Sequence, residues 1–239
     1  MNDQQFNSYG QPVGPSVAGD LPWNRPGNVR LQGRFCSLEP LRAGMHGDDL
    51  YQAYSLSSDP RDWTYMFAGP FDSREAFQAY LLAAEASEDP KHYAVIDEAT
   101  QKAVGTLSLM RQDVANGVIE VGNVMFSPLL KQKPASTEAQ LLLMSYVFDD
   151  LGYRRYEWKC DSLNAPSRKT AERLGFKFEG IFRQAVIYKG RSRDTSWYSI
   201  IDREWRGVER VLSQWLAPDN FDEDGTQRQS VAEVRASQG

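Results

Sequence analysis

The chain has 239 residues, of which 41% are hydrophobic and 25% charged, and its net charge is −5. These values are ordinary for a globular protein, and the acidic balance argues against a nucleic-acid binder, which needs clustered Lys and Arg. Two cysteines and two histidines supply neither a disulfide framework nor a metal site, and no segment has the roughly 20 apolar residues of a membrane span. We expect a cytoplasmic protein with no metal, membrane or nucleic-acid partner.

Both ends of the chain have the composition of tails. Residues 1–20 are rich in Gly, Pro, Ser, Gln and Asn and lack a hydrophobic period, which predicts a disordered arm. Residues 219–239 are acidic and then polar, which predicts a second disordered tail. The folded domain is therefore expected over residues 21–218.

The first half of this domain predicts a strand or hairpin, two helices and then three strands. "VRLQGRFCSLEPL" and "GMHGDDLYQAYSL" give the opening strand and the first helix. Asp72 and Glu75 have capping-box spacing, so a second helix is expected from about Ser73 to before Pro90. "HYAVID", "AVGTLSLMR" and "GVIEVGNVMF" are short apolar runs with brief connections, which predicts an antiparallel meander.

The second half predicts a helix between two strands, a short helix, a hairpin and a last helix. Thr137 and Gln140 have capping-box spacing at the start of the first of these helices. "RRYEWKC" alternates charged and apolar residues, which predicts a strand with one polar and one buried face. Asn164 and Gly175 are expected to cap and end the helix in "NAPSRKTAERLGF", and the hairpin to turn near Lys189. The order is mixed α/β.

Common catalytic motifs are absent. The chain has no G-x-G-x-x-G, G-x-x-x-x-G-K-[ST], G-x-S-x-G or H-E-x-x-H sequence. Dinucleotide-binding, P-loop, α/β-hydrolase and zincin functions thereby lose their main sequence support.

A different combination stands out: "EVGNVMFSP", a short loop, "TEAQLLL", and then "NAPSRKTAERLGFKFEG". Gly122 lies inside the first of these segments, where a strand glycine indicates a bulge or a close backbone approach. Together these segments resemble the RimJ/RimL-like branch of the GNAT superfamily of N-acetyltransferases, over residues 30–205. The resemblance implies an α/β fold, with a mostly antiparallel twisted sheet flanked by helices and splayed central strands.

The resemblance also implies acetyl-CoA as cosubstrate, with its pantetheine arm on a strand and its pyrophosphate at a helix start. The implied cofactor residues are Asn123, Val124, Met125, Phe126, Lys131, Gln132, Lys133, Ala135, Ser136, Thr137, Asn164 and Ser167. The pyrophosphate loop departs from the family pattern because it has no glycine and contains Pro134, which has no N–H. The amides of Lys133, Ala135, Ser136 and Thr137 remain, together with two lysines and two hydroxyls. We therefore expect binding by fewer backbone donors and more side-chain charge.

Acetyl transfer to an amine needs a group that removes a proton, because an alkylammonium with a pKa around 10 has no lone pair at pH 7. Glu120 is the candidate base, and a solvent-facing or ion-paired strand residue is the alternative for it. Ser167 is the candidate group for orienting the thioester. Tyr188 and Tyr198 are alternative acids.

The resemblance places the acceptor between the first helices and the closing hairpin. Trp63, Tyr65, Arg183 and Arg193 are the candidate substrate residues there, and they suit an amine that carries a carboxylate or an apolar body. The acceptor is thus a small molecule, an amino acid or a peptide or protein N-terminus. A catalytically inactive CoA-binding or regulatory module is the alternative function, and both a monomer and a homodimer remain open.

Overall fold

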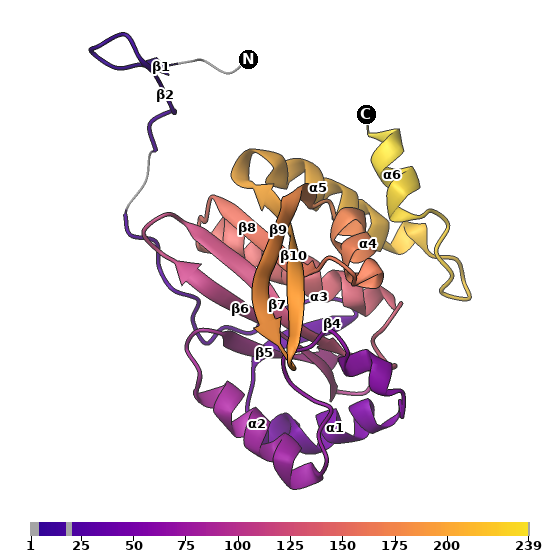
Figure 1. Ribbon diagram of the computed structural model, residues 1–239. Helices are drawn as coiled ribbons and strands as arrows, with labels where there is room; N and C mark the ends of the chain where they lie inside the picture. Colours follow the sequence, from indigo (N-terminus) through magenta and orange to yellow (C-terminus); the bar gives the residue numbers. More distant parts are fainter. Residues whose placement is uncertain (1–4, 18–20, 239) are drawn as a thin grey trace.

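The structure, a computed structural model, describes residues 5–17 and 21–238. Its centre is an eight-stranded sheet with the order β3-β4-β5-β6-β7-β8-β10-β9 (Figure 1). The strands are β3 (Leu31–Gln32), β4 (Cys36–Pro40), β5 (Lys91–Asp97), β6 (Lys102–Asp113), β7 (Val118–Phe126), β8 (Arg155–Asp161), β9 (Lys177–Tyr188) and β10 (Arg191–Ile201). The helices are α1 (Ala43–Ser55), α2 (Arg74–Ala86), α3 (Pro134–Ser145), α4 (Ala165–Leu174), α5 (Asp202–Leu216) and α6 (Val231–Ser237). The predicted α/β fold class is confirmed.

One pair of neighbouring strands, β7 and β8, runs parallel, and all the others run antiparallel. The connection from β7 to β8 contains α3, as a parallel pair requires. Their ladder extends only from Val118↔Arg155 to Val121↔Trp158, although β7 continues to Phe126 and β8 to Asp161. The predicted splaying of the central strands is therefore confirmed.

Two apolar cores lie on opposite faces of the sheet. Ala94 and Ile96 of β5 belong to the core that α1 and α2 cover, whereas Tyr93 and Val95 belong to the core that α3 and α5 cover. Side chains alternate between the two faces of a strand, so the two helix pairs must lie on different sides. The side of α1 and α2 is called the acceptor face below, and the other side the α3 face.

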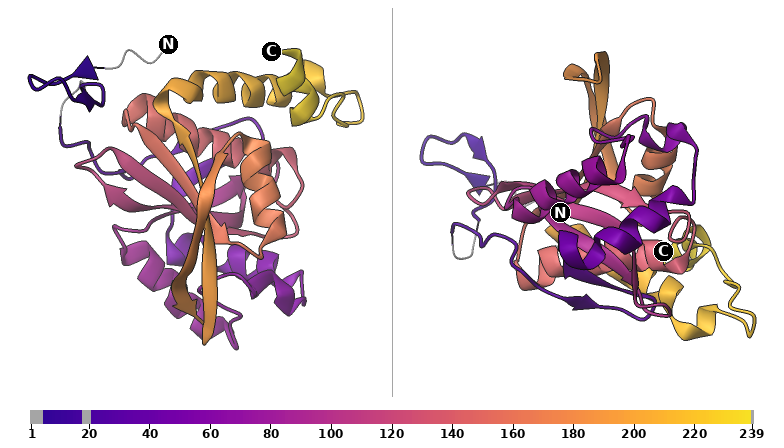
Figure 2. Two further views of the ribbon diagram at one scale, coloured as in Figure 1. Left: turned by 45° about the horizontal axis from the view of Figure 1, so that its top comes forward. Right: turned by 90° about the horizontal axis from the view of Figure 1, so that it is seen from below.

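The hairpin of β9 and β10 projects beyond the rest of the molecule (Figure 2). It turns at Lys189 and Gly190, which both have positive φ angles, so the predicted turn is confirmed. Most of β9 is exposed, since β9 is an edge strand and no helix packs over its outer end.

Two predicted helix caps were wrong. Ser73, and not Asp72, caps α2 by accepting a hydrogen bond from the amide of Ala76. α3 begins at Pro134, three residues before Thr137, because proline is well suited to the first turn, where its missing N–H is not needed. The caps predicted for α4, Asn164 at its start and Gly175 at its end, are confirmed.

The C-terminal segment does not form the expected disordered tail. Ser230 caps α6, and the side chains of Val231 and Val234 are buried in the core of the α3 face. Arg235 donates to the backbone carbonyl of Arg173 at 2.7 Å, which joins α6 to α4. Composition predicted a tail because α6 buries two apolar residues, Val231 and Val234, and so short a pattern does not stand out in the sequence.

The N-terminal segment contains a small antiparallel pair, β1 (Gln5–Phe6) and β2 (Pro12–Val13), whose residues are exposed. The rest of the arm expected there, residues 1–4 and 18–20, lies outside the described residues. Within residues 5–17 and 21–238, no helix combines the length and the apolar character needed to cross a bilayer.

Candidate active site

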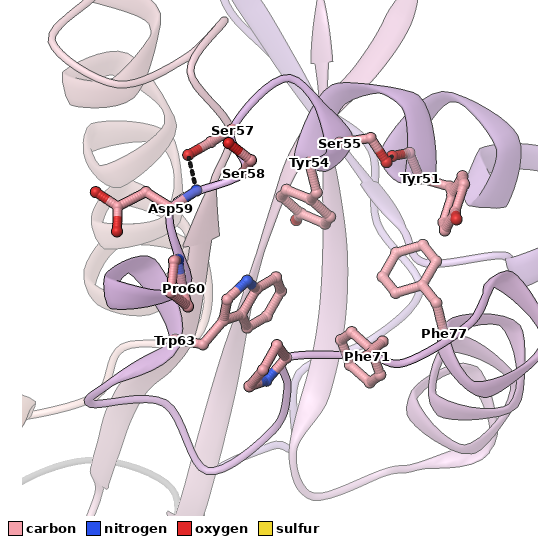
Figure 3. A pocket seen from close by; sticks show the side chains of 11 residues that line it. Tyr51, Tyr54, Ser55, Ser57, Ser58, Asp59, Pro60, Trp63, Phe71 and Phe77 are labelled. Atoms are coloured by element: carbon pink, nitrogen blue, oxygen red, sulfur yellow. Dashed lines mark hydrogen bonds between the residues drawn. The ribbon is translucent and has the colours of Figure 1, made fainter.

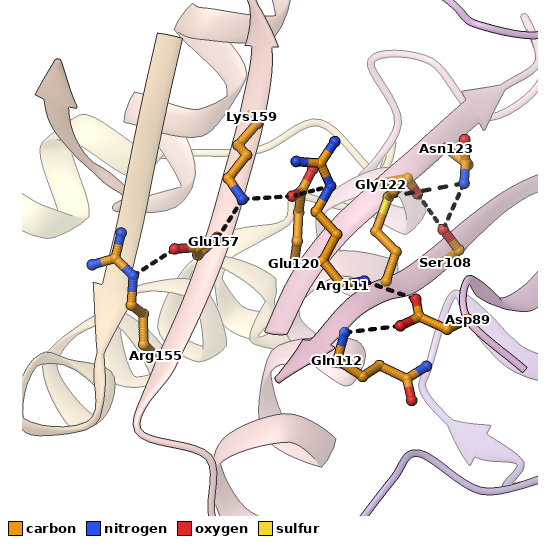
Figure 4. Close-up of polar contacts among 11 residues, drawn as sticks. Asp89, Ser108, Arg111, Gln112, Glu120, Gly122, Asn123, Arg155, Glu157 and Lys159 are labelled. Carbon is orange, nitrogen blue, oxygen red and sulfur yellow. Dashed lines mark hydrogen bonds and ion pairs between the residues drawn. The ribbon is translucent and has the colours of Figure 1, made fainter. Parts of the chain in front are cut away.

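The site is built around the gap where β7 and β8 diverge. Asn123 and Val124 form a bulge, since Gly122 pairs with Ser108 and Met125 with Thr106, which leaves two residues of β7 opposite one of β6. Asn123 has a φ angle of 49°, and its side-chain amide donates to Ser108 Oγ at 3.1 Å (Figure 4). The bulge turns β7 away from β8 immediately after their last pair.

Gly122 lies beside the bulge rather than in it. A Cβ at this position would lie 2.1 Å from Sδ of Met110, so the Met110 side chain packs directly over the glycine and would have to move for any other residue. Sequence therefore predicted the irregularity one residue too early. The left-handed conformation belongs to Asn123.

The backbone of β7 beyond the bulge is only partly available. The hydroxyl of Tyr54 donates to the carbonyl of Met125 at 2.8 Å, and Phe126 still pairs with Gly105. Val124 lies in the bulge, outside the ladder with either neighbour. The gap thus exposes mainly Asn123 and Val124 of the four residues predicted to face a cofactor.

The loop from Ser127 to Lys133 leads into α3 and is closed by its own backbone bonds. The amide of Lys131 donates to the carbonyl of Ser127 at 2.9 Å, and the amide of Lys133 donates to Leu130 at 3.2 Å. Gln132 has a φ angle of 59°, so this loop adopts a left-handed turn without a glycine. Among the described residues, the amides of Gln132 and Ala135 have no hydrogen-bond acceptor.

Several predicted phosphate ligands are already engaged. The amide of Ser136 and its hydroxyl both donate to the carbonyl of Lys133. The Thr137 side chain is buried, and its hydroxyl accepts from Arg173 at 2.8 Å. Both hydroxyls therefore have partners within the protein, and their binding to phosphate stays a prediction.

The two lysines of the loop differ. Nζ of Lys131 lies 2.7 Å from the carboxylate of Asp62, which belongs to the 3₁₀ turn Pro60–Trp63 on the acceptor side. Lys133 is exposed. The loop therefore presents one fully available cation, Lys133. The other, Lys131, is held in a surface ion pair, which contributes little free energy in water.

The start of α4 borders the same gap. The side-chain oxygen of Asn164 accepts from the amide of Ser167 at 3.2 Å, as a helix cap does. Ser167 Oγ accepts from Nε1 of Trp158 at 3.0 Å. Indole nitrogen only donates, so the hydroxyl hydrogen of Ser167 can still be given to another acceptor.

A buried ionic network lies at the closed end of the gap, on the acceptor face (Figure 4). Nζ of Lys159 lies 2.9 Å from Glu120 and 2.6 Å from Glu157, and Arg155 lies 2.7 Å from Glu157. The Lys159 ammonium also lies 3.8 Å from the centre of the Trp197 ring. The predicted division of β8 into a charged and an apolar face is confirmed, but the charged face lies inside the protein, where its charges pair with one another.

Glu120 is the carboxylate of this network that lies on β7. Its side chain is 6% exposed and also lies 3.4 Å from Nε of Arg111. Burial raises the pKa of Glu120, and the positive charges of Lys159 and Arg111 oppose this rise only in part. The alternative of a solvent-facing residue is wrong, whereas an ion-paired carboxylate with a raised pKa is what the site contains.

A cavity of about 230 Å³ lies between α1, the turn Pro60–Trp63 and α2 (Figure 3). Its walls combine aromatic rings with polar side chains: they are Tyr51, Tyr54, Ser55, Ser57, Ser58, Asp59, Pro60, Trp63, Pro70, Phe71 and Phe77. Trp63 meets Phe71 edge to face at 5.4 Å between ring centres. Tyr54 joins this cavity to the gap, since its hydroxyl binds the Met125 carbonyl.

The hairpin tip holds the loop that carries Trp63. Nζ of Lys189 donates to the carbonyls of Trp63 and Gly69, at 2.8 and 2.6 Å, and Arg191 donates to Thr64 at 2.8 Å. Tyr65, on the same loop, donates to the carbonyl of Leu163 before α4 at 3.2 Å. The structure therefore brings Trp63 and Tyr65 together with the gap.

The two arginines predicted for the acceptor side separate. Arg183 is exposed on β9 and lines a different hollow with Gln184 and Asp194, so its grouping with Trp63 was wrong. Arg193 is buried, with its guanidinium 5.4 Å from the Phe67 ring. The alternation of the hairpin strands could not show this, because a bulge in β9 places Arg183, Gln184 and Ala185 opposite the single residue Asp194 of β10.

The tyrosines predicted as alternative acids are both engaged. The hydroxyl of Tyr188 donates to the Asp161 carboxylate at 2.8 Å, and its pKa is raised to about 12, first by burial and then by Asp161. The hydroxyl of Tyr198 lies on the α3 face between Arg168 and Glu172. In the described part of the chain, no three His, Cys, Asp or Glu side chains form a metal-binding group.

Sequence reasoning did not find three residues that shape this site, namely Tyr54, Lys159 and Lys189. Lys159 follows Glu157 by two residues, and pairing β8 in parallel with β7 would have placed it near Glu120. No local signal indicates Tyr54 or Lys189, because their bonds are to backbone carbonyls of distant segments.

Comparison with known proteins agrees with this geometry. Residues 38–177 match the family described as "Acetyltransferase (GNAT) domain". The chain is similar to a GCN5-related N-acetyltransferase of Brucella melitensis, at 48% identity and a TM-score of 0.88, over 90% of this chain and 97% of that structure. It is also 31% identical to an uncharacterised N-acetyltransferase of Bacillus licheniformis, over 63% of this chain and 85% of that protein.

A more distant structure is that of a Salmonella typhimurium acetyltransferase that modifies the N-terminal serine of the ribosomal protein L7/L12. It is 19% identical, with a TM-score of 0.61, and the match covers 71% of this chain and 96% of that one. This likeness concerns the fold alone.

Proposed function

This chain belongs to the GNAT family of acetyltransferases, and we propose that it transfers the acetyl group of acetyl-CoA to a primary amine. The observation that supports this most is the divergence of β7 and β8 beyond Val121 and Trp158. An extended arm of amides and carbonyls can bind there to backbone groups that no neighbouring strand occupies. The aromatic cavity on the acceptor face suits an amine with an apolar body.

The N-terminus of α3 is the proposed pyrophosphate site. The amides of Gln132 and Ala135 and the ammonium groups of Lys131 and Lys133 can meet the phosphates, and the dipole of α3 favours an anion. Fewer backbone amides are available than in a glycine-rich loop, so the lysine side chains supply a larger share of the binding free energy of the pyrophosphate. Lys131 must leave Asp62 to take part.

The start of α4 is the proposed position of the cofactor sulfur. Asn164 caps the helix through its oxygen, which leaves its side-chain NH₂ group to donate to the pantetheine arm. The free hydroxyl hydrogen of Ser167 is proposed to orient the thioester. It can also donate to the sulfur as the C–S bond breaks.

Glu120 is the proposed base. Its raised pKa brings it closer to that of the amine than an exposed carboxylate, which favours proton transfer. Lys159 holds it on the acceptor face, one residue before the ladder ends. The amine nitrogen would lose its proton toward Glu120, directly or through water, and then attack the thioester carbonyl.

We place the chain in the RimJ/RimL-like branch because "NAPSRKTAERLGF" folds as a capped helix with Ser167 in its first turn. A module that binds CoA without transferring acetyl is the second candidate, and the glycine-free loop is the observation that favours it.

Calorimetry with acetyl-CoA, followed by a thiol-release assay over a panel of amines, separates these candidates. The enzyme requires binding and amine-dependent release of CoA. Binding without turnover of any amine supports the module, and the absence of binding contradicts both.

A further inference from the structure

The side chain of Arg193 is largely buried, and no carboxylate of the described residues forms an ion pair with its guanidinium. The residue is 7% exposed, and its Nε has neither solvent nor a hydrogen-bond partner. Within residues 5–17 and 21–238, its guanidinium forms no hydrogen bond or ion pair. Buried charges in proteins are paired as a rule, because removing a cation from water is unfavourable.

The surroundings compensate this charge only in part. The rings of Phe67 and Tyr188 lie 5.4 and 5.9 Å from the guanidinium carbon, which provides cation–π contact. The carboxylate of Asp161 accepts instead from the Tyr188 hydroxyl at 2.8 Å and from the Leu163 amide at 2.9 Å. The Asp161 carboxylate is therefore hydrogen-bonded to these two donors and forms no ion pair with Arg193.

The position of Arg193 connects it to the acceptor side. It lies on β10 two residues before Thr195, which pairs with Asp161 at the end of β8. Phe67 lies between the 3₁₀ turn, which ends at Trp63, and α2, and residues 63–73 are called the acceptor loop. Arg193 therefore lies at the mouth end of the β7–β8 gap, against the acceptor loop.

The neighbouring cations of the hairpin do not share this property. Lys189 and Arg191 donate to carbonyls of the acceptor loop, and Arg183 is exposed to water. Among these cations of the described hairpin, Arg193 is the one whose side chain is largely buried and has no hydrogen-bond or ion-pair partner.

We propose that Arg193 binds the carboxylate of the acceptor, so that the acceptor is an amino carboxylate, a molecule whose primary amine and carboxylate are a few atoms apart. The planar guanidinium can form two parallel hydrogen bonds with a carboxylate, which orients the amine as well as holding it. This inference rests on the proposed function. It restricts the acceptor to amines that also carry a carboxylate.

Matched acceptors test it: L-phenylalanine against phenethylamine and L-phenylalaninamide, and L-alanine against ethylamine. The wild-type protein should show a kcat/KM at least about 10-fold higher for each amino acid than for its partner without carboxylate. Arg193→Gln should remove this preference, and Arg193→Lys should keep part of it. Arg210→Gln, an exposed arginine of α5, is the matched control and should keep the full preference. Equal kcat/KM values within each pair would overturn the proposal.

Thermal unfolding adds a readout that separates a binding role from a structural one. Removing an uncompensated buried charge does not weaken a fold, so Arg193→Met should unfold at the same or a higher temperature than the wild type. A clear fall in Tm would mean that the cation is structurally required, which contradicts the proposal.

Calorimetry with L-phenylalanine in the presence of CoA distinguishes failure of this inference from failure of the proposed function. Binding that Arg193→Gln abolishes, without turnover of any amine, supports the carboxylate site and contradicts the transferase. Binding of equal strength in both proteins, or no binding in either, contradicts the carboxylate site.

Discussion

Val121 and Trp158 form the last backbone pair between β7 and β8, and the bulge at Asn123 begins two residues after Val121. The gap is therefore a consequence of local backbone geometry in β7. Ser108 fixes this geometry, since its hydroxyl donates to the Gly122 carbonyl at 3.0 Å and accepts from Asn123. The candidate site depends on this small set of bonds.

Replacing both loop lysines, Lys131→Ala and Lys133→Ala, should weaken acetyl-CoA binding by about 3- to 10-fold, because charge replaces the missing loop amides. The dependence of the Kd on salt should also become shallower. Calorimetry at two salt concentrations measures both effects.

Lys177→Ala is the control for this experiment. Lys177 is exposed, and its ammonium group pairs with the carboxylate of Glu204. It lies at the start of β9, level with the first residues of β8 and not with the gap. An equal loss of affinity in this variant, or none in the double variant, would make the loop that carries Lys131 and Lys133 a connector without a role in binding.

Glu120→Gln should lower kcat by about 100-fold or more, with a small change in KM for acetyl-CoA, because the amide cannot take a proton. In the wild type, kcat should fall as the pH drops through the raised pKa of Glu120, and this acidic limb should disappear in the variant. A steady-state pH profile measures both.

Glu157→Gln is the matched control, because Glu157 binds the same Lys159 ammonium from β8. Its kcat should change much less, and its acidic limb should remain. An equal loss in the two variants would show that the network is structural and that Glu120 is not the base.

Sequence patterns predicted the elements of the sheet well, since the short apolar runs of β5 to β7 and the cap of α4 are local signals. The network of Glu120, Glu157 and Lys159 could not be predicted in this way. A charged residue on an alternating strand ordinarily faces water, and here only the packing of the acceptor face buries it. The caps at Asp72 and Thr137 failed because spacing alone does not locate the first helical turn.

His92 should make stability depend on pH. Burial lowers its pKa to about 4, whereas in the unfolded chain it is near 6.5. Between these values the unfolded chain binds a proton that the folded chain excludes, so the free energy of unfolding should fall as the pH falls from 6.5 to 4. The effect of this residue is up to about 3 kcal/mol.

Chemical denaturation of the wild type and of His92→Gln at several pH values tests this. The variant should lose stability less steeply between pH 6.5 and 4. Some slope should remain, because burial also lowers the pKa of His46. Parallel curves for the two proteins would contradict the assignment.

The C-terminal helix gives a further prediction. Val234→Asp should destabilise the fold by about 2 kcal/mol or more, because it buries a carboxylate in the core of the α3 face. Ala232→Asp places the same side chain on the exposed face of α6 and should change stability by less than about 0.5 kcal/mol. Equal stability of both variants would return this segment to the disordered tail that its composition indicated.

Hydrogen exchange of the full chain with and without acetyl-CoA tests the central claim most directly. If the cofactor lies in the gap, exchange should slow for the amides of residues 122–126 and 131–137 and for the start of α4, while β4 and β5 remain unchanged. Unchanged exchange in these segments at saturating acetyl-CoA, or protection confined to another part of the chain, would contradict the account.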